Sequence, residues 1–183
     1  MFKLKILIIS LLIFSCFDNS VKTIKNNEPK NKIVKIPLNL ESDNIKGYLG
    51  EYLKLKNSLI KDDIEATLKI QITLENELRK INYNSKSSEK QNDFSSIIDL
   101  LLRDLSEMKL KSIKKQRIIF DKLSQNVMSL IKLTGSNEKI YQHYCPMFNK
   151  NKGGMWLSSS KEIYNPLFGS KMLKCGYVKG EIN

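Results

Sequence analysis

The sequence predicts an all-α protein: an antiparallel four-helix bundle that carries a short irregular, β-containing cap at its C-terminus. Apolar residues recur at three- and four-residue steps through most of residues 45–131, which is the spacing of one buried stripe on a helix. The links between the stripes are short, which favours antiparallel neighbours. Residues 136–183 lose this period and are dense in turn residues, which predicts the cap.

The first two helices are predicted on either side of an acidic pair, Asp62 and Asp63. One apolar stripe occupies residues 45–59, and a second occupies residues 64–81. The acidic pair between them fits a helix break followed by an N-cap. Residues 82–92 are polar and rich in Ser and Asn, so we expect a loop there.

The third and fourth helices are predicted from stripes over residues 94–108 and 117–131. Gly135 follows the fourth stripe and suits a helix stop. The basic stretch 109–115 lies between the two stripes and contains neither Gly nor Pro. One long helix through these lysines is therefore an alternative to two helices.

Residues 1–15 are predicted to be a lipoprotein signal peptide. Lys3 and Lys5 give it a positive start, and the apolar run that follows is too short to span a bilayer as a helix. The run ends at Cys16, the position that resembles the acylated Cys of bacterial lipoproteins, where two or more acyl chains would anchor the protein stably. The next residue, Phe17, is not acidic, which under the usual sorting logic favours the outer membrane. An ordinary secretory signal with an incidental Cys16 is the alternative.

A lipid anchor predicts a location in the envelope of a Gram-negative bacterium, with the domain facing the periplasm. Residues 16–40 are rich in Lys, Asn and Ser and predict a flexible tether, and the domain then spans residues 41–183. The net charge of +12 falls to +10 when the signal peptide takes Lys3 and Lys5 with it. The chain carries no nucleic-acid-binding motif, so we attribute this charge to solvated faces near an anionic lipid surface and expect no nucleic-acid partner.

The candidate site lies in the cap, where sulfur ligands gather with the only His of the chain. His143, Cys145 and Met147 alternate at a two-residue step, which on an extended segment places all three side chains on one face. Met172 and Cys175 lie three residues apart, so a single helical turn would direct both to one side.

This set of residue types suits a soft metal ion. Thiolate, thioether and imidazole ligands select Cu(I), and Met155 completes the candidate ligand set. The neighbouring Trp156 could stack over a bound cation. The predicted function on this interpretation is the binding of copper.

Three roles for the two thiols stay open: ligands of the metal ion, partners in a disulfide, or free thiols. Cys145 and Cys175 are the cysteines that remain beside Cys16, and export permits a disulfide between them. A bond that closes a loop of about thirty residues would contribute on the order of 3–4 kcal/mol. The cap would then be purely structural, and His143 an ordinary polar residue of the surface. The third alternative is two free thiols without a role.

Catalysis is not expected. A nucleophilic Cys145 would need a base beside it, and His143 is the only His. The pair Gly153 and Gly154 stands alone and predicts a turn rather than an oxyanion-binding motif.

Several blocks of the sequence resemble the DUF3347 family, over roughly residues 45–180. Two are helical, YLKLKNSLIKDD at 52–63 and QRIIFDKLS at 116–124. The tail adds YCPM at 144–147, WLS at 156–158, NP at 165–166, Gly169, ML at 172–173 and CG at 175–176. The family usually has an aromatic residue after the Asn-Pro pair, where this chain has Leu167, a departure that concerns packing more than ligation.

The resemblance implies an envelope protein associated with metal handling. The family occurs as stand-alone exported proteins and as an appendage to periplasmic adaptor subunits of heavy-metal efflux pumps, notably those that resemble copper and silver exporters. It therefore suggests a metal-efflux adaptor or pump as partner, in an efflux or tolerance context. The alternative is a non-catalytic envelope interaction module whose cap is stapled by the Cys145–Cys175 disulfide.

Overall fold

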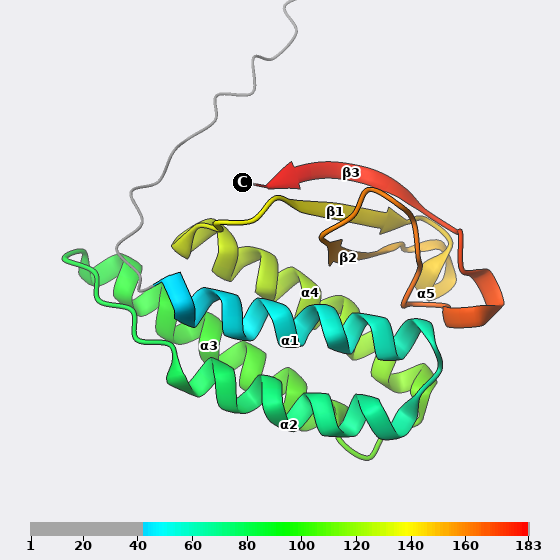
Figure 1. Cartoon of the computed structure of the whole chain (residues 1–183), viewed down its shortest axis with the longest axis horizontal. Coiled ribbons are helices and arrows are strands. Elements are labelled where there is room, and N and C mark those ends of the chain that lie inside the picture. Colours follow the sequence, from blue (N-terminus) through cyan, green and yellow to red (C-terminus); the bar gives the residue numbers. More distant parts are fainter. Residues whose placement is uncertain (1–41, 183) are drawn as a thin grey trace, which may run out of the picture. The chain divides into compact units, whose positions relative to one another are not determined.

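The computed structural model describes residues 42–182 (Figure 1). The predicted signal peptide, the lipidation of Cys16 and the tether lie outside the described residues. Within them the chain is mostly helical, with four long helices, and it ends in a small three-stranded antiparallel sheet. This confirms the predicted helical fold with a β-containing C-terminal part. No helix of the described part combines the length and the apolar character that a membrane span requires.

The first two helices are separated where the acidic pair predicted. Helix α1 spans Ser42–Ile60 and α2 spans Ile64–Lys80. Asp63 is the N-cap of α2, because its Oδ1 accepts a hydrogen bond from the Ala66 N–H at 2.9 Å. Asp62 has a φ of 58°, which reverses the chain between the helices.

The next two helices are α3, Ser88–Met108, and α4, Ile113–Thr134. Residues 109–112 separate them, with Leu110 at a φ of 57°, so the alternative of one long helix is wrong. Gly135, at a φ of 85°, ends α4 as predicted by donating its N–H to the Ile131 carbonyl at 2.7 Å. The predicted loop 82–92 was too long, because Ser87 caps α3 and the polar first turn is helical and exposed.

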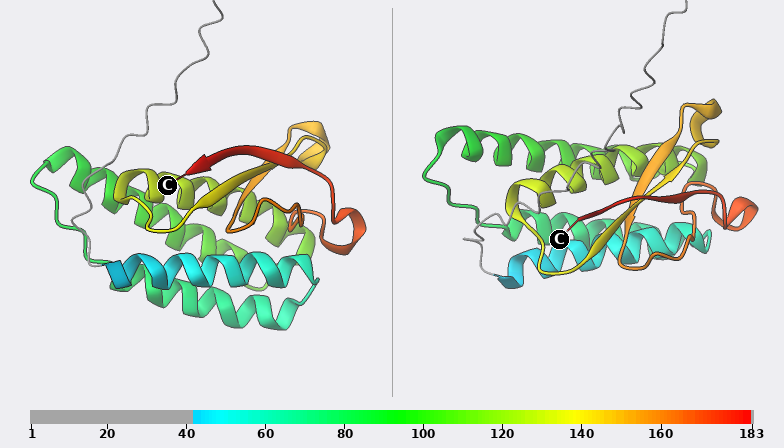
Figure 2. Two further views of the ribbon diagram at one scale, coloured as in Figure 1. Left: turned by 45° about the horizontal axis from the view of Figure 1, so that its top comes forward. Right: turned by 90° about the horizontal axis from the view of Figure 1, so that it is seen from above.

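The long helices pack as α1 on α2, α2 on α3 and α3 on α4, and they bury one continuous core (Figure 2). The buried face of α2 differs from the predicted stripe. Ile64 and Ile72 are 47% and 56% exposed, while the polar Thr67 and Gln71 are fully buried. The largest fully buried helical side chains are Tyr48, Tyr52, Leu55, Leu59, Leu74, Leu78, Leu101, Leu105, Met108, Phe120 and Leu123.

The sheet consists of β1, Ile140–Cys145, β2, Gly154–Ser158, and β3, Tyr177–Ile182, in the order β2-β1-β3. The short helix α5, Phe148–Asn151, lies between β1 and β2, and a 3₁₀ turn, η1, Gly169–Met172, precedes β3. In all three views of the ribbon the sheet lies over one side of the helices (Figures 1 and 2). Its strand β2 contacts α4 and α1.

Side chains from the helices complete the outer edge of β2. The Leu157 N–H donates to Tyr52 Oη on α1 at 3.0 Å, Tyr52 Oη lies 2.7 Å from Ser124 Oγ on α4, and Ser124 donates to the Phe120 carbonyl at 2.7 Å. The Met155 N–H donates to Asp121 Oδ1 at 2.8 Å. An edge strand exposes unpaired backbone donors unless something covers them, and here the helices do so.

Replacing Tyr52 with Phe tests this connection. We expect the free energy of unfolding to fall by about 1–3 kcal/mol, because the Leu157 N–H would be buried without an acceptor. Urea denaturation followed by circular dichroism measures it. Tyr83→Phe is the control, since Tyr83 is only partly buried and stacks on Phe94 through its ring. An equal loss in both variants would contradict a specific role for the Tyr52 hydroxyl.

The opposite edge of the sheet, β3, is largely exposed. The pairing of β1 with β3 is interrupted between Gln142 and His143, and Lys179 has no opposite residue there. A bulge and a lysine on an edge strand both discourage pairing with another strand.

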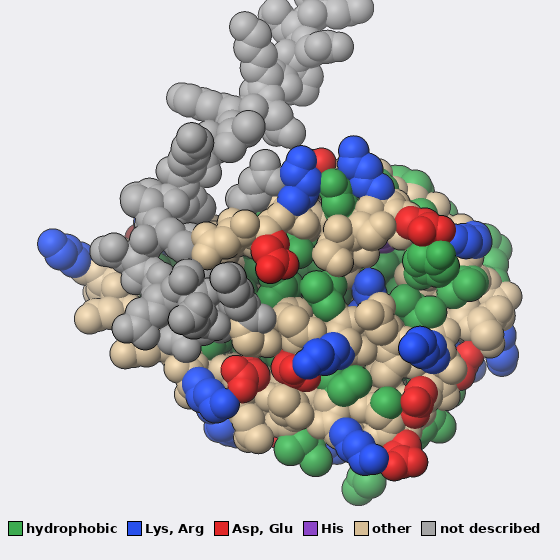
Figure 3. Space-filling view, in the orientation of Figure 1, with side chains coloured by type: hydrophobic (Ala, Val, Ile, Leu, Met, Phe, Trp, Pro, Cys, Tyr) green, Lys and Arg blue, Asp and Glu red, His purple; other side chains and the backbone are tan. Residues whose placement is uncertain are grey.

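The charge of the molecule is spread rather than gathered on the face that Figure 3 shows. Lys and Arg side chains alternate there with acidic and apolar ones. Several lysines and arginines of residues 42–182 pair with carboxylates at neighbouring helical positions, as Lys69 does with Glu65 and Arg79 with Glu75. Such exposed pairs contribute little to stability.

Candidate functional site

The two cysteines of the cap lie next to each other. Cys145 is the last residue of β1 and is buried, and Cys175 is half-buried in the turn before β3. Their Sγ atoms are 2.8 Å apart. Met172 is linked to this turn through its carbonyl, which accepts the Cys175 N–H at 3.1 Å. The fold therefore brings together the two thiols that the sequence separates by thirty residues.

Asn165 holds the Cys175 turn in place. Its Nδ2 donates to the Cys175 carbonyl at 2.7 Å, and its Oδ1 accepts the N–H groups of Leu167 at 2.7 Å and Phe168 at 3.2 Å. Asn165 is fully buried. From the sequence, Asn165 was named only as part of the Asn-Pro block of the family resemblance, and its role in positioning a cysteine was missed.

The separation of the sulfur atoms favours a bond between them over a metal ion. Two sulfurs on one tetrahedral metal with bonds of about 2.3 Å would lie roughly 3.8 Å apart, whereas a disulfide requires about 2.05 Å. Burial, and then the neighbouring Cys145, raise the pKa of Cys175 to about 11. The thiolate that a metal or an electrophile would need is therefore disfavoured while both thiols are reduced.

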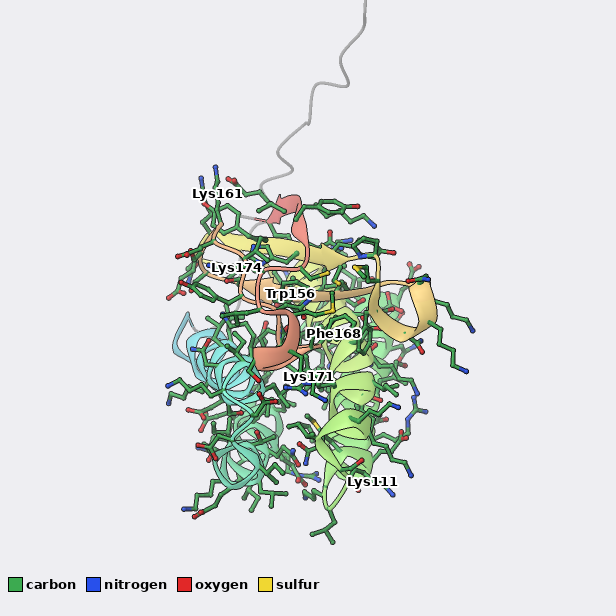
Figure 4. The ribbon with its side chains drawn as sticks, turned by 90° about the vertical axis from the view of Figure 1, so that its right-hand side faces the viewer. Lys111, Trp156, Lys161, Phe168, Lys171 and Lys174 are labelled. Carbon is green, nitrogen blue, oxygen red and sulfur yellow. The ribbon has the colours of Figure 1, made fainter. Side chains whose placement is uncertain are left out.

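His143 and Trp156 form a second pair on the side of the sheet that faces the helices. They stand opposite each other on β1 and β2, and their rings meet edge to face at 5.3 Å between centroids. Both side chains are fully buried, and Figure 4 shows Trp156 between the sheet and the helices. A Cβ on Gly176 would lie 2.9 Å from Trp156 Cη2, so the indole closes over a glycine.

The burial of these two side chains bears on two expectations, that His143 is a polar residue of the surface and that Trp156 stacks over a bound cation. His143 is not a surface residue: burial first, and then the charge of Lys56, lower its pKa to about 4. The indole of Trp156 packs against His143 and Gly176, and its Nε1 has no hydrogen-bond partner.

Two methionines of the candidate set, Met147 and Met155, are not grouped with the two cysteines. β1 ends at Cys145, and Met147 has helical backbone angles at the start of α5 and is 51% exposed, so the expected alternation does not extend to it. Met155 is buried beside Gln142, whose Nε2 donates to its Sδ at 3.6 Å. Among residues 42–182, no three His, Cys, Asp or Glu side chains form a group that could hold a metal ion.

A buried arginine that the sequence did not mark as a site residue ties the cap to the helices. Arg117 on α4 donates from Nε to the Pro166 carbonyl at 2.9 Å and from Nη2 to the Leu59 carbonyl at 2.8 Å, and it forms an ion pair with Asp62. Asp62 also accepts the Ser170 N–H at 3.2 Å. Hydrogen bonds from Ser170 and then from Arg117 lower the pKa of Asp62, against the effect of burial.

With four long helices followed by a small antiparallel sheet, the protein is of the class of small helical domains that carry a C-terminal sheet. The chain belongs to the DUF3347 family: residues 49–139 match the model described as a protein of unknown function (DUF3347). The match extends from α1 to the residue before β1, so the strands, the cysteine pair and Trp156 follow it. No curated protein and no solved structure matches the chain.

Proposed function

We propose that this protein is a non-catalytic interaction module of the cell envelope, whose cap is held on the helices by a disulfide between Cys145 and Cys175. The observation that carries this proposal is the 2.8 Å separation of the two Sγ atoms. Closing the bond requires a movement of less than about 1 Å, and an exported protein meets an oxidising environment. The partner suggested by the family is an adaptor or pump subunit of metal efflux.

The N-terminal sequence supports a lipid anchor at Cys16, in the outer membrane and facing the periplasm. A tether over residues 16–40 can reach at most about 80–90 Å when fully extended. The four long helices are proposed to act as one antiparallel bundle, which their shared core supports. Fractionation of cells that express the wild type and Cys16→Ser tests the anchor: the variant should leave the membrane fraction, and an unchanged distribution would contradict lipidation.

The disulfide predicts a measurable loss of stability on reduction. Without reductant, alkylation and mass spectrometry of the mature protein should find neither Cys145 nor Cys175 modified, and with reductant both. Reduction, or Cys175→Ser, should lower the free energy of unfolding by about 3–4 kcal/mol, the contribution expected for a loop of about thirty residues.

The control is Cys145→Ser, which should cost about as much as Cys175→Ser and make the protein insensitive to reductant. Two freely alkylated thiols in protein purified without reductant would end the disulfide proposal.

A second candidate function is binding of Cu(I) by the reduced pair. The adjacency of the two thiols supports it, since soft metals select cysteine, and a shift of the Cys175 turn would open the space between them. Anaerobic Cu(I) titration of the reduced protein tests it, with Met147→Ala combined with Met172→Ala as the variant. Absence of binding tighter than micromolar in the wild type, or no loss in the variant, would remove the methionine-assisted copper site.

A further inference from the structure

A buried lysine lies where α1 meets the sheet. Lys56 is 8% exposed, and its Nζ donates to Ser158 Oγ on β2 at 3.4 Å. None of the ion pairs formed within residues 42–182 includes Lys56. Buried ammonium groups are normally paired with a negative charge, because removing them from water is costly. The side chain of Lys56 therefore lacks its expected partner.

Two side chains near Lys56, Ser158 and His143, can still donate a hydrogen bond. Ser158 Oγ accepts from Lys56 and also from the Ser160 N–H at 3.2 Å, which uses both acceptor positions and leaves its hydroxyl hydrogen to donate. His143 is fully buried, and its ring nitrogens make no well-formed hydrogen bond, although, against the effects of burial and of Lys56, the nearby Ser160 backbone raises its pKa. Burial and the charge of Lys56 keep this imidazole neutral at neutral pH, so one of its nitrogens carries a hydrogen to donate.

The register of the sheet places two of these donors on one face. His143 stands opposite Trp156, and Ser158 follows Trp156 by two residues on the same strand. Residues related in this diagonal way lie about 7–8 Å apart, which is within reach of a long or aromatic side chain. That spacing suits one small ion or water molecule between the imidazole and the hydroxyl, beside the Lys56 ammonium.

We propose that Lys56, Ser158 and His143 bind one small monovalent anion of the size and charge of chloride. The ammonium supplies the charge, and the hydroxyl and the imidazole N–H supply directional hydrogen bonds. An anion would accept from the remaining donor positions of these groups and would supply the counter-charge that Lys56 lacks, whereas a water molecule would supply only an acceptor. This proposal is independent of the proposed function, because it involves neither cysteine.

The direct test is a crystal of the full mature chain grown in bromide. We expect one anomalous peak within hydrogen-bonding distance of Lys56 Nζ and Ser158 Oγ, and its loss in Lys56→Met, where the stem of the side chain keeps its packing. Density of a water molecule without an anomalous signal would overturn the proposal. So would a bromide peak that persists in Lys56→Met, since the ion would then be adventitious.

A solution test covers the case in which the variant folds poorly. At constant ionic strength, replacing gluconate with chloride should raise the Tm of the wild type by about 2–4 °C, because the ion binds the folded state. Lys56→Met should lose this shift. Lys86→Met, which removes an exposed lysine from the α2–α3 loop, should keep it. No shift in the wild type, or an equal shift in both variants, would contradict a specific site.

Discussion

Replacing Arg117 with Met should lower the free energy of unfolding by about 3 kcal/mol, because two buried backbone carbonyls would each lose a hydrogen bond from a charged donor. The guanidinium joins three segments, since it donates to the Leu59 carbonyl at the end of α1, to the Pro166 carbonyl in the cap, and to Asp62. Asp62 is 37% exposed and can be rehydrated, so the two carbonyls account for most of the loss. Urea denaturation followed by circular dichroism measures it.

Two further variants separate geometry from charge. Arg117→Lys keeps the charge, but its single ammonium nitrogen cannot span the three separated acceptors that the guanidinium reaches, so we expect an intermediate loss. Gly169→Ala should destabilise the wild type, because its φ is 60° and a Cβ would clash with Arg117 Nη2. In the Arg117→Met background the same change should cost less, since that clash is removed. A loss below about 1 kcal/mol for Arg117→Met would show that the cap is held by other contacts.

Replacing Trp156 with Ala should cost about 3–5 kcal/mol, the usual range for a large aromatic residue in a core. The indole is fully buried between the sheet and the helices, and it fills the space against His143 and above Gly176. Its removal would leave a cavity on the inner side of β2, the strand that contacts α4 and α1. Thermal and urea denaturation of the wild type and the variant, followed in the far ultraviolet, measure the effect.

Trp156→Phe is the matched control, and it should recover about half of the loss because it refills part of the cavity. Hydrogen exchange adds a local measurement: amides of β1 and β2 should lose protection in the Ala variant before those of α3. A loss below about 1 kcal/mol would contradict a role of Trp156 in core packing and would favour the alternative that Trp156 stacks over a bound cation.

The helices were predictable from the sequence because apolar spacing and capping residues act locally. Asp63 and Gly135 end or begin helices through hydrogen bonds to neighbours within four residues. The face of α2 was misjudged, because Thr67 and Gln71 are buried in place of Ile64 and Ile72. Thr67 donates to Ser58 Oγ on α1 at 2.8 Å, a contact that depends on how two helices pack and not on either stripe alone.

The candidate residues were recognisable by type, but their grouping was not. Cys145 and Cys175 meet because Asn165 fixes the turn before β3 and β3 pairs with β1, and neither interaction has a local sequence signal. Met147 left the expected alternation because the strand ends before it. Arg117 was counted in an apolar stripe, which predicted its burial correctly but gave no sign of its three partners.

The hydrogen bond from the Leu157 N–H to Tyr52 has a consequence for the order in which the chain can fold. The two residues are 105 positions apart in the sequence, and each is buried. A two-stranded hairpin is marginal by itself and is stabilised by packing against a helix, so the β1–β2 pair gains α1 and α4 as the surface on which it forms. Tyr52 in turn gains this partner only when the chain is complete as far as β2. The packing of α1 is therefore completed only when β2, one of the last elements of the chain, has been synthesised. In a chain shortened before β2, Tyr52 would lack this hydrogen bond and part of the core would be missing.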